Sequence, residues 1–407
     1  MIITVVCDVL GEETNGTTVA AMNLIRTLQA KGHDVRILCA DQDKKGQEGY
    51  YVVPVLSLGK LLNKYIKKVG VVIAKTDEKV LREALEGTDH VHIMVPLILG
   101  IAATKMAKEM GISTTAGFHM QAENFTSHIK LNKVGLANKA VYKFIYNKCY
   151  KYMDLIHYPT QFICDMFEKN IKHKTPARII SNGVHSYVTK RDVEKPEEYK
   201  DKFVIMMIGR YGREKSQDTI IKAIYHSKHK DKIQLIFAGQ GPKEKKYRKL
   251  AKKLPIQPRF GTIPRDKIVD VINYSDMYCH AAEVELEGIA CLEGIACGKL
   301  TVVSDSKLAA IKEFAVDERC LFKNRDPKDL ARVIDYWIDH PEERAAVEEK
   351  YLASAGKFDH NSCMDRMEQM VVEAYEINKQ NKLKAAEEEK ENKSNKKDRK
   401  KDKKKKK

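Results

Sequence analysis

The sequence has no CxxC pair, no long apolar run and no basic segment ahead of its first apolar residues. Its nine cysteines are odd in number and scattered, which is typical of reduced thiols in a cytosolic protein and argues against a disulfide frame or a cysteine zinc site. The longest apolar stretch, residues 93–103, contains a proline and is far shorter than the roughly 20 residues of a spanning helix. The opening MIITVVCDVLG therefore predicts a strand rather than a signal peptide. We expect a cytoplasmic protein that is either soluble or lies on a membrane surface.

Positive charge is concentrated at the end of the chain. The formal net charge is +17, of which residues 381–407, with 14 basic and 6 acidic side chains, hold +8. The remaining body is mildly basic, which suits a phosphate-bearing substrate, an anionic membrane or nucleic acid. The last 27 residues cannot bury apolar surface, so their composition predicts a disordered, lysine-rich tail. No aromatic residue lies among these lysines, so base stacking, and with it nucleic acid as a partner, is not expected.

Short β-rich runs alternate with helical patterns along most of the chain. IITVVCDV, VRILCA and HVHIMV are strand-like, and the alternation restarts with KFVIMMIGR, IQLIFAGQG, MYCHAA and LTVVSD after a polar segment at 186–201. This order predicts an α/β fold of two Rossmann-like, doubly wound domains facing each other across a cleft. The expected divisions are an N-terminal Rossmann-like domain at 1–190, a second Rossmann-like domain at 200–345, helices packing back on the body at 346–380, and the tail at 381–407.

The stretch FVIMMIGRYGREK places Gly209 and Arg210 at the end of a predicted strand, with Lys215 five positions after the arginine. Glycine allows a close approach of backbone to ligand, while arginine and lysine suit a phosphate. The alternative interpretation is an ordinary loop with exposed bases.

The stretch AEVELEGIACLEGIACGK separates Glu285 from Glu293 by seven residues. A helix starting near Gly288 and Ile289 places Glu285 in the preceding loop and Glu293 on the second turn. The helix amino terminus between the two carboxylates suits a diphosphate, and a carboxylate there can accept hydrogen bonds from a sugar diol. The alternative is a solvated acidic loop ahead of a helix.

Together, the Gly-Arg with its lysine, LIFAGQGP and the glutamate pair resemble the carboxyl half of glycosyltransferase family 4. The opening VVCDVLGEETNGTTVAAMNLIRTLQAKGHDVRIL, the stretch TTAGFHMQAEN and the stretch SNGVH resemble its amino half, so the resemblance covers nearly all of residues 1–380. It implies a retaining, metal-independent enzyme of the GT-B fold that uses a nucleotide-diphosphate sugar as donor and needs no cofactor. It also implies that the domain at 1–190 binds the acceptor and that the domain at 200–345 binds the donor.

The resemblance also implies roles for single residues. Arg210 and Lys215 neutralise the donor diphosphate, Glu285 contacts the donor sugar, and Glu293 holds the ribose hydroxyls. The implied catalytic residues are His119, Glu285, Arg210 and Lys215. The implied donor-binding residues are Gly16, Gly209, Arg210, Lys215, Glu285, Gly288, Ile289 and Glu293.

Two features depart from or compete with this pattern. Glu287 stands where the family has an aromatic residue, which predicts an extra charge beside the sugar. Asp41 and Asp43 form the Asp-X-Asp of metal-dependent glycosyltransferases, although their position favours a solvated turn.

Two basic amphipathic stretches, residues 60–68 and 130–152, suit an anionic membrane surface or form a solvated lysine face over buried aromatics. The residues assigned to the acceptor or membrane side are Lys60, Lys64, Lys67, Lys139, Lys143 and Lys148.

We expect transfer of a hexose, with UDP-glucose as the leading donor, to a membrane lipid or cell-envelope glycan at the inner face of the cell membrane, as in bacterial diacylglycerol glucosyltransferases. The alternatives are a soluble or polysaccharide acceptor, a GT-B protein that binds nucleotide sugars without transfer, and an epimerase on the same double α/β plan.

Overall fold

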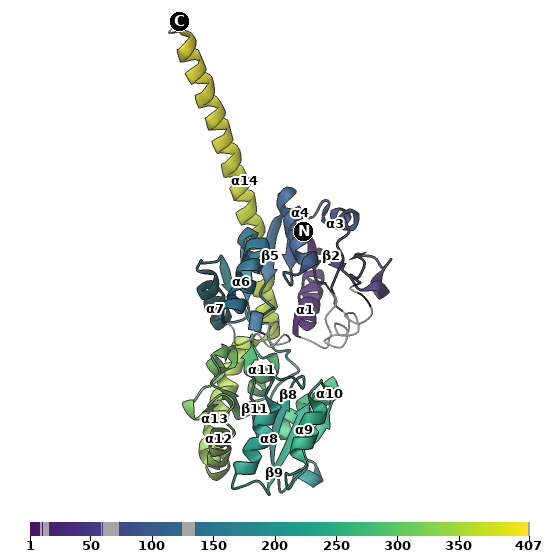
Figure 1. Ribbon diagram of the computed structural model, residues 1–407, viewed down its shortest axis with the longest axis vertical. Helices are drawn as coiled ribbons and strands as arrows, with labels where there is room; N and C mark the ends of the chain where they lie inside the picture. Colours follow the sequence, from purple (N-terminus) through teal and green to yellow (C-terminus); the bar gives the residue numbers. More distant parts are fainter. Residues whose placement is uncertain (9, 11–15, 58, 60–72, 124–134, 406–407) are drawn as a thin grey trace.

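The computed structural model describes the backbone of residues 1–8, 10, 16–57, 59, 73–123 and 135–405, and side chains up to residue 389. Figure 1 shows two α/β halves stacked along the long axis of the molecule, with the last helix extending away from the first half. Each half is built on a parallel sheet, which confirms the doubly wound α/β prediction.

The first half contains a seven-stranded parallel sheet in the order β3-β2-β1-β4-β5-β6-β7. Its strands are β1 (Ile2–Val6), β2 (Asp34–Cys39), β3 (Tyr50–Val52), β4 (His90–Ile93), β5 (Ser113–Gly117), β6 (Leu155–Tyr158) and β7 (Ala177–Ile179). Its described helices are α1 (Gly16–Ala30), α3 (Glu78–Leu85), α4 (Ile98–Glu109), α6 (Gly135–Lys148) and α7 (Gln161–Ile171), with 3₁₀ turns η1 (Gln42–Lys44) and η2 (Tyr150–Tyr152). Apolar cores lie on both faces of this sheet, as crossover helices require.

The second half contains a six-stranded sheet in the order β10-β9-β8-β11-β13-β15, beside a small sheet of β12 and β14. Its strands are β8 (Phe203–Ile208), β9 (Ile233–Ala238), β10 (Arg259–Gly261), β11 (Met277–His280), β12 (Val284–Glu285), β13 (Thr301–Ser304), β14 (Leu308–Ala309) and β15 (Leu321–Phe322). Its helices are α8 (Gln217–His226), α9 (Glu244–Ala251), α10 (Arg265–Tyr274), α11 (Ile289–Ala296), α12 (Pro327–Asp339) and α13 (Pro341–Ser354), and the 3₁₀ turns are η3 (Glu197–Tyr199), η4 (Ala310–Phe314), η5 (Glu318–Cys320) and η6 (Ala355–Phe358).

The last helix, α14 (His360–Lys405), returns the chain to the first half. Met364, Met367 and Val371 are buried in the core that α1 and the first sheet also line. Residues 381–389 are exposed, so this part buries no apolar surface, as its composition predicts. The helix assignment runs on to Lys405, since lysine, glutamate and alanine favour helix and neither proline nor glycine interrupts the run.

The two halves meet through the segments that follow β5, β6 and β7. The Gln121 side chain donates to the Leu308 carbonyl at 2.9 Å, and the Thr160 hydroxyl donates to the Leu286 carbonyl at 3.1 Å. Because Leu308 lies on β14, which pairs with β12, the carboxyl edge of the first sheet is held against β12 and its surroundings.

Two further expectations concern the cysteines and the lack of a helix that could cross a membrane. All nine cysteines are buried and free, as their number and spacing predict. Within the described part of the chain, no helix is both long enough and apolar enough to cross a bilayer.

Candidate active site

The strand order of the second sheet reverses between β8 and β11. At such a switch point the carboxyl ends of the strands leave a crevice in which α/β proteins bind ligands. Gly209 and Arg210 follow β8, and His280 is the last residue of β11. The predicted phosphate-binding residues therefore lie at the switch point.

Two glycines bring the loops after β8 and β9 into backbone contact. Gly209 and Gly239 have φ angles of +152° and +154°, which other residues rarely adopt. A Cβ on Gly239 would lie 2.2 Å from the Gly209 carbonyl oxygen. Arg210 follows this contact between the loops and is exposed at the end of the sheet. The chain then continues to Lys215.

Lys215, Glu285 and His280 form the central cluster of the site. The Lys215 ammonium pairs with Glu285 Oε2, and His280 Nε2 lies 3.1 Å from the same oxygen. The side chains of Lys215 and Glu285 are 22% and 14% exposed, whereas that of His280 is 1% exposed. Burial raises the pKa of Glu285, but the Lys215 ammonium and the His280 hydrogen bond outweigh burial and hold that pKa at about 2. Glu285 is therefore an anion with two fixed donors.

Gly288 turns the chain from β12 into α11. It has a φ of +85°, and a Cβ there would lie 2.8 Å from Ile311 Cγ2 and 3.2 Å from Glu285 Cγ. Ile289 is the first residue of α11, so the unpaired amides of that helix begin directly beside Glu285. Glu285 was expected in a loop, but it lies on β12 because that segment pairs in parallel with β14.

Glu293 lies on α11, as predicted, and is buried. Its Oε1 is 3.1 Å from the guanidinium of Arg265 at the start of α10. Burial raises the pKa of Glu293, and Arg265 opposes that rise. The two glutamates of the motif thus have different partners, Lys215 and His280 for the first and Arg265 for the second.

The Glu287 side chain is buried and is bound to residues of the first half. Its carboxylate accepts hydrogen bonds from the Ser181 hydroxyl and from the backbone and side-chain N–H groups of Asn182. These partners follow β7, so Glu287 joins the two halves of the molecule. The sequence pattern could not show this, because the partners are more than 100 positions away.

His119 follows β5, two residues before the Gln121 contact with β14. Its ring folds back over Gly117, where a Cβ would lie 2.4 Å from Nε2, and lies 5.6 Å from the His157 ring, centroid to centroid. Burial, with a smaller effect of His157, lowers the pKa of His119 to about 3. The imidazole is therefore neutral near pH 7.

The predicted amino-terminal loop is described only at its end, where Gly16 is the exposed first residue of α1. We expected Asp41 in a solvated turn, but its side chain is buried and accepts a hydrogen bond from the Leu10 amide at 2.8 Å. Asp43 is exposed and pairs with Lys44 at 3.5 Å.

Among the described residues, the one cluster with metal-ligand geometry is Cys164, Asp165 and Glu168. Glu168 already accepts hydrogen bonds from Lys174 and Thr175, so it is engaged within the protein. This cluster lies on α7 and is not part of the candidate site.

The basic stretch at 130–152 forms α6 from Gly135 onward. Lys143 and Lys148 are exposed and Lys139 is half-buried. Leu136 and Phe144 on the same helix are 79% and 54% exposed, so the surface of α6 is apolar as well as basic. Lys60, Lys64 and Lys67 lie outside the described residues.

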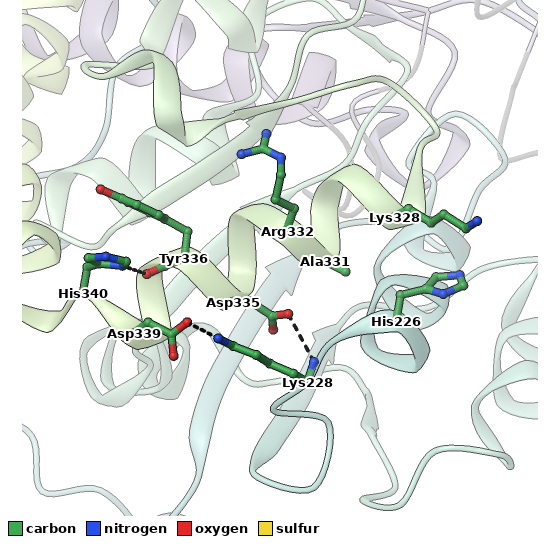
Figure 2. A pocket seen from close by; sticks show the side chains of 9 residues that line it. All are labelled: His226, Lys228, Lys328, Ala331, Arg332, Asp335, Tyr336, Asp339 and His340. Atoms are coloured by element: carbon green, nitrogen blue, oxygen red, sulfur yellow. Dashed lines mark hydrogen bonds and ion pairs between the residues drawn. The ribbon is translucent and has the colours of Figure 1, made fainter.

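A hollow of about 620 Å³ lies between α8 and α12, and Figure 2 shows the side chains that line it. Lys228 pairs with Asp339 at 2.6 Å and donates its backbone N–H to Asp335 at 3.1 Å. This hollow shares no residue with the loops after β8 and β11 and is not part of the candidate site. A hollow of about 430 Å³ lies closer to the central cluster, lined by Glu283, by residues 305–308 and by residues 323–324.

Sequence reasoning missed His280 and Arg265 as members of the site. The spacing of His280 from the other histidines fits no metal site, so the sequence favours an ordinary packed or surface histidine at this position. The available signal was its position, a polar residue at the end of the apolar run MYCHAA and five residues before Glu285. Arg265 gave no comparable signal, since only the packing of α10 against α11 brings it to Glu293.

Two family models together match most of the chain. Residues 14–186 match the family described as Glycosyltransferase Family 4, and residues 188–351 match the family described as Glycosyl transferases group 1. The alpha-monoglucosyldiacylglycerol synthase of Streptococcus pneumoniae is 22% identical over 72% of this chain and 68% of its own length.

The phosphatidylinositol N-acetylglucosaminyltransferase GPI3 subunit of Saccharomyces cerevisiae is 30% identical, but over 32% of this chain and only 29% of its own length. The crystal structure of Anabaena HepE in complex with UDP-glucose has a TM-score of 0.70 and 16% identity, and covers 92% of this chain and 100% of that one. This last likeness establishes the GT-B architecture.

Proposed function

Because this chain belongs to glycosyltransferase family 4, within the group 1 glycosyl transferases, we propose that it transfers a hexose from a nucleotide-diphosphate sugar to a membrane lipid. The leading donor is UDP-glucose, and the leading acceptor is diacylglycerol or a glycosylated diacylglycerol. A cell-envelope glycan is the second acceptor class.

The central cluster at the switch point of the second sheet is the observation on which this proposal rests. Lys215 and the exposed Arg210 supply positive charge where β8 ends, and α11 begins beside Glu285. Two cations and a helix amino terminus suit a diphosphate, while the ionised Glu285 suits donor hydroxyl groups. The buried Glu293 is assigned to the ribose hydroxyls.

The reaction that we propose is the retaining transfer that the family resemblance implies. An acceptor oxygen bonds to the anomeric carbon of the sugar while the bond from that carbon to the phosphate oxygen breaks. The leaving diphosphate takes the acceptor proton on the same face, so the configuration of the sugar is retained. Arg210 and Lys215 stabilise the negative charge that develops on the leaving group, and we propose that no metal ion is needed for that task. The neutral His119 is assigned to the side where sugar and acceptor meet.

Two observations support a lipid acceptor. The relatives named above act, by their names, on diacylglycerol and phosphatidylinositol. In addition, the surface of α6 combines exposed lysines with the exposed Leu136 and Phe144, a combination that suits the surface of an anionic bilayer. We therefore propose that the protein acts at a membrane surface, which we expect to be the inner face of the cell membrane.

Donor and metal dependence can be measured in one experiment. The protein is incubated with UDP-glucose, UDP-N-acetylglucosamine, GDP-mannose or an ADP-sugar and anionic vesicles containing diacylglycerol, with and without EDTA. We expect EDTA-resistant release of UDP and a new glycolipid. Lys215→Ala and Glu293→Ala should each reduce transfer by at least about 100-fold. Both variants should keep the far-UV spectrum and the melting temperature of the wild-type protein.

Other outcomes would change the proposal in defined ways. Tight nucleotide binding without turnover on any acceptor would identify a binding protein, and conversion of the donor without an acceptor would identify an epimerase. Loss of activity in EDTA would contradict the metal-independent mechanism.

Vesicle sedimentation tests whether the exposed surface of α6 binds an anionic membrane. The double variant Lys143→Gln/Lys148→Gln should bind anionic vesicles about 30-fold more weakly, since each lysine near such a surface contributes about 1 kcal/mol. The matched control is Lys245→Gln/Lys249→Gln, which removes the same charge from exposed positions on α9 in the other half. Equal binding by both double variants would exclude α6 as the docking surface.

A further inference from the structure

His280 differs from the other members of the central cluster in being almost completely buried. Its Nε2 lies 3.1 Å from Glu285 Oε2, and its Nδ1 lies 3.4 Å from the hydroxyl of Tyr278. Since Glu285 is ionised, Nε2 must carry the proton and donate it, which leaves Nδ1 to accept from the Tyr278 O–H. Both nitrogens of a neutral ring then have partners.

Tyr278 is itself fixed in the core. Its hydroxyl lies 3.4 Å from the Ile208 amide, its ring stacks on that of His280, and a Cβ on Gly294 would lie 2.8 Å from its Cγ. Tyr278 therefore lies between the last residue of β8 and the middle of α11. A continuous chain of contacts links the end of β8, through two buried side chains of β11, to the carboxylate on β12.

Lys215 and His280 differ in the number of groups that each side chain contacts when the donor is bound. Under the proposed function the Lys215 ammonium faces the diphosphate as well as Glu285, and its charge is shared between them. His280 is buried below the carboxylate and has no other described acceptor on that nitrogen. The orientation of Glu285 therefore depends on His280 whenever Lys215 contacts phosphate.

We propose that His280 is a positioning residue of the transfer reaction, which holds the Glu285 carboxylate toward the hydroxyl groups of the donor sugar. Tyr278 supports it by fixing the ring and its tautomer. This inference rests on the proposed function for the role of Glu285, and it adds a residue to which the sequence resemblance gave no role.

A positioning role predicts a specific kinetic pattern. His280→Leu keeps the volume and removes the hydrogen bond, so kcat for transfer from UDP-glucose should fall about 10- to 100-fold. The affinity for UDP, which depends on Arg210, Lys215 and the start of α11, should stay within about threefold of the wild-type value. A general structural defect would instead lower UDP affinity and melting temperature together with kcat.

Two further variants separate the hydrogen bond from packing. His280→Gln places an amide N–H near the position of Nε2, so it should recover most of the lost kcat. Tyr278→Phe keeps the ring against Gly294 but removes the hydroxyl, so kcat should fall less than in His280→Leu. A His280→Leu protein with kcat within twofold of wild type, or equal losses in the Leu and Gln variants, would overturn the inference.

One readout does not require turnover. The imidazole ¹⁵N spectrum of the wild-type protein should show His280 as the neutral Nε2–H tautomer, and Glu285→Gln should shift that resonance. If the wild-type protein transfers no sugar from any donor, the proposed function fails, while the spectrum still decides whether His280 holds Glu285. A charged ring, the Nδ1–H tautomer or a resonance unaffected by Glu285→Gln would reject the inference.

Discussion

At the scale of single residues, backbone conformation at Gly288 decides where the Glu285 carboxylate and the start of α11 lie relative to each other. The residue has a φ of +85°, and the space that a side chain would occupy is filled by Ile311 and by Glu285 itself. Glycine is needed at this position for two independent reasons, the conformation and the close approach.

Gly288→Ala should therefore destabilise the protein by about 2 kcal/mol, because the left-handed conformation costs alanine about 1 kcal/mol and the Ile311 contact adds to it. The displaced Glu285 side chain should also raise the KM for donor. Urea unfolding and initial rates measure the two effects. The control is Gly356→Ala, where a Cβ meets nothing within 4 Å and φ is not positive, and which should change stability by less than about 0.5 kcal/mol. Equal stability of both variants would show that the turn relaxes freely.

Glu285 and His280 also show the limit of arguments from one residue at a time. Burial alone would raise the pKa of the Glu285 carboxyl, yet the surrounding donors hold it at about 2. The same burial lowers the pKa of His280 and keeps its ring neutral, although Glu285 opposes that shift. The ionised state of Glu285 therefore depends on its two donors, whereas the neutral state of His280 is set by burial against the effect of Glu285.

At the scale of secondary-structure elements, apolar runs of strand length gave reliable predictions. The runs FVIMMI and IQLIFA became β8 and β9, because strands covered on both faces are apolar throughout. Strands of two or three residues, such as β12 and β14, have no detectable period. They form because a neighbouring strand is present, which the local sequence does not record.

Helix α14 combines two parts with different energetics. Its first turns bury methionines against the first sheet and α1, whereas residues 381–389 are exposed. We predict that Met367→Ala lowers the free energy of unfolding by about 2–4 kcal/mol, while deletion of residues 384–407 changes it by less than about 0.5 kcal/mol. Chemical denaturation of the two variants and the wild type measures both values. A large loss on deletion would mean that the end of α14 packs on the body.

At the scale of the whole molecule, Glu287 joins the halves through Ser181 and Asn182. Burial raises the pKa of this carboxyl from about 4.5 to about 7, although the hydrogen bonds from Ser181 and Asn182 oppose the rise. Between these two pH values the folded protein keeps a proton that the unfolded chain has released. Stability from this group is therefore fully present below about pH 4.5 and is lost as the pH rises to about 7.

The difference in pKa corresponds to about 3 kcal/mol. Glu287→Gln removes the titrating group, so the stability of wild type relative to this variant should fall by about 3 kcal/mol between pH 4.5 and pH 8. Denaturation at a series of pH values measures this difference. The control Glu349→Gln changes an exposed carboxylate on α13 and should follow the wild type. A constant difference between wild type and Glu287→Gln would show that Glu287 titrates as it does in an unfolded chain.

The sequence by itself determined the two doubly wound halves, the family, and the motif residues Arg210, Lys215, Glu285 and Glu293, because apolar runs and short motifs are local properties of the chain. Only the tertiary structure decided which groups each motif residue contacts. His280 contacts Glu285 and Arg265 contacts Glu293. Glu287 binds Ser181 and Asn182 of the first half, and Asp41 is a buried acceptor. These contacts depend on strand order and on the packing of distant segments, and a linear sequence does not state either of them.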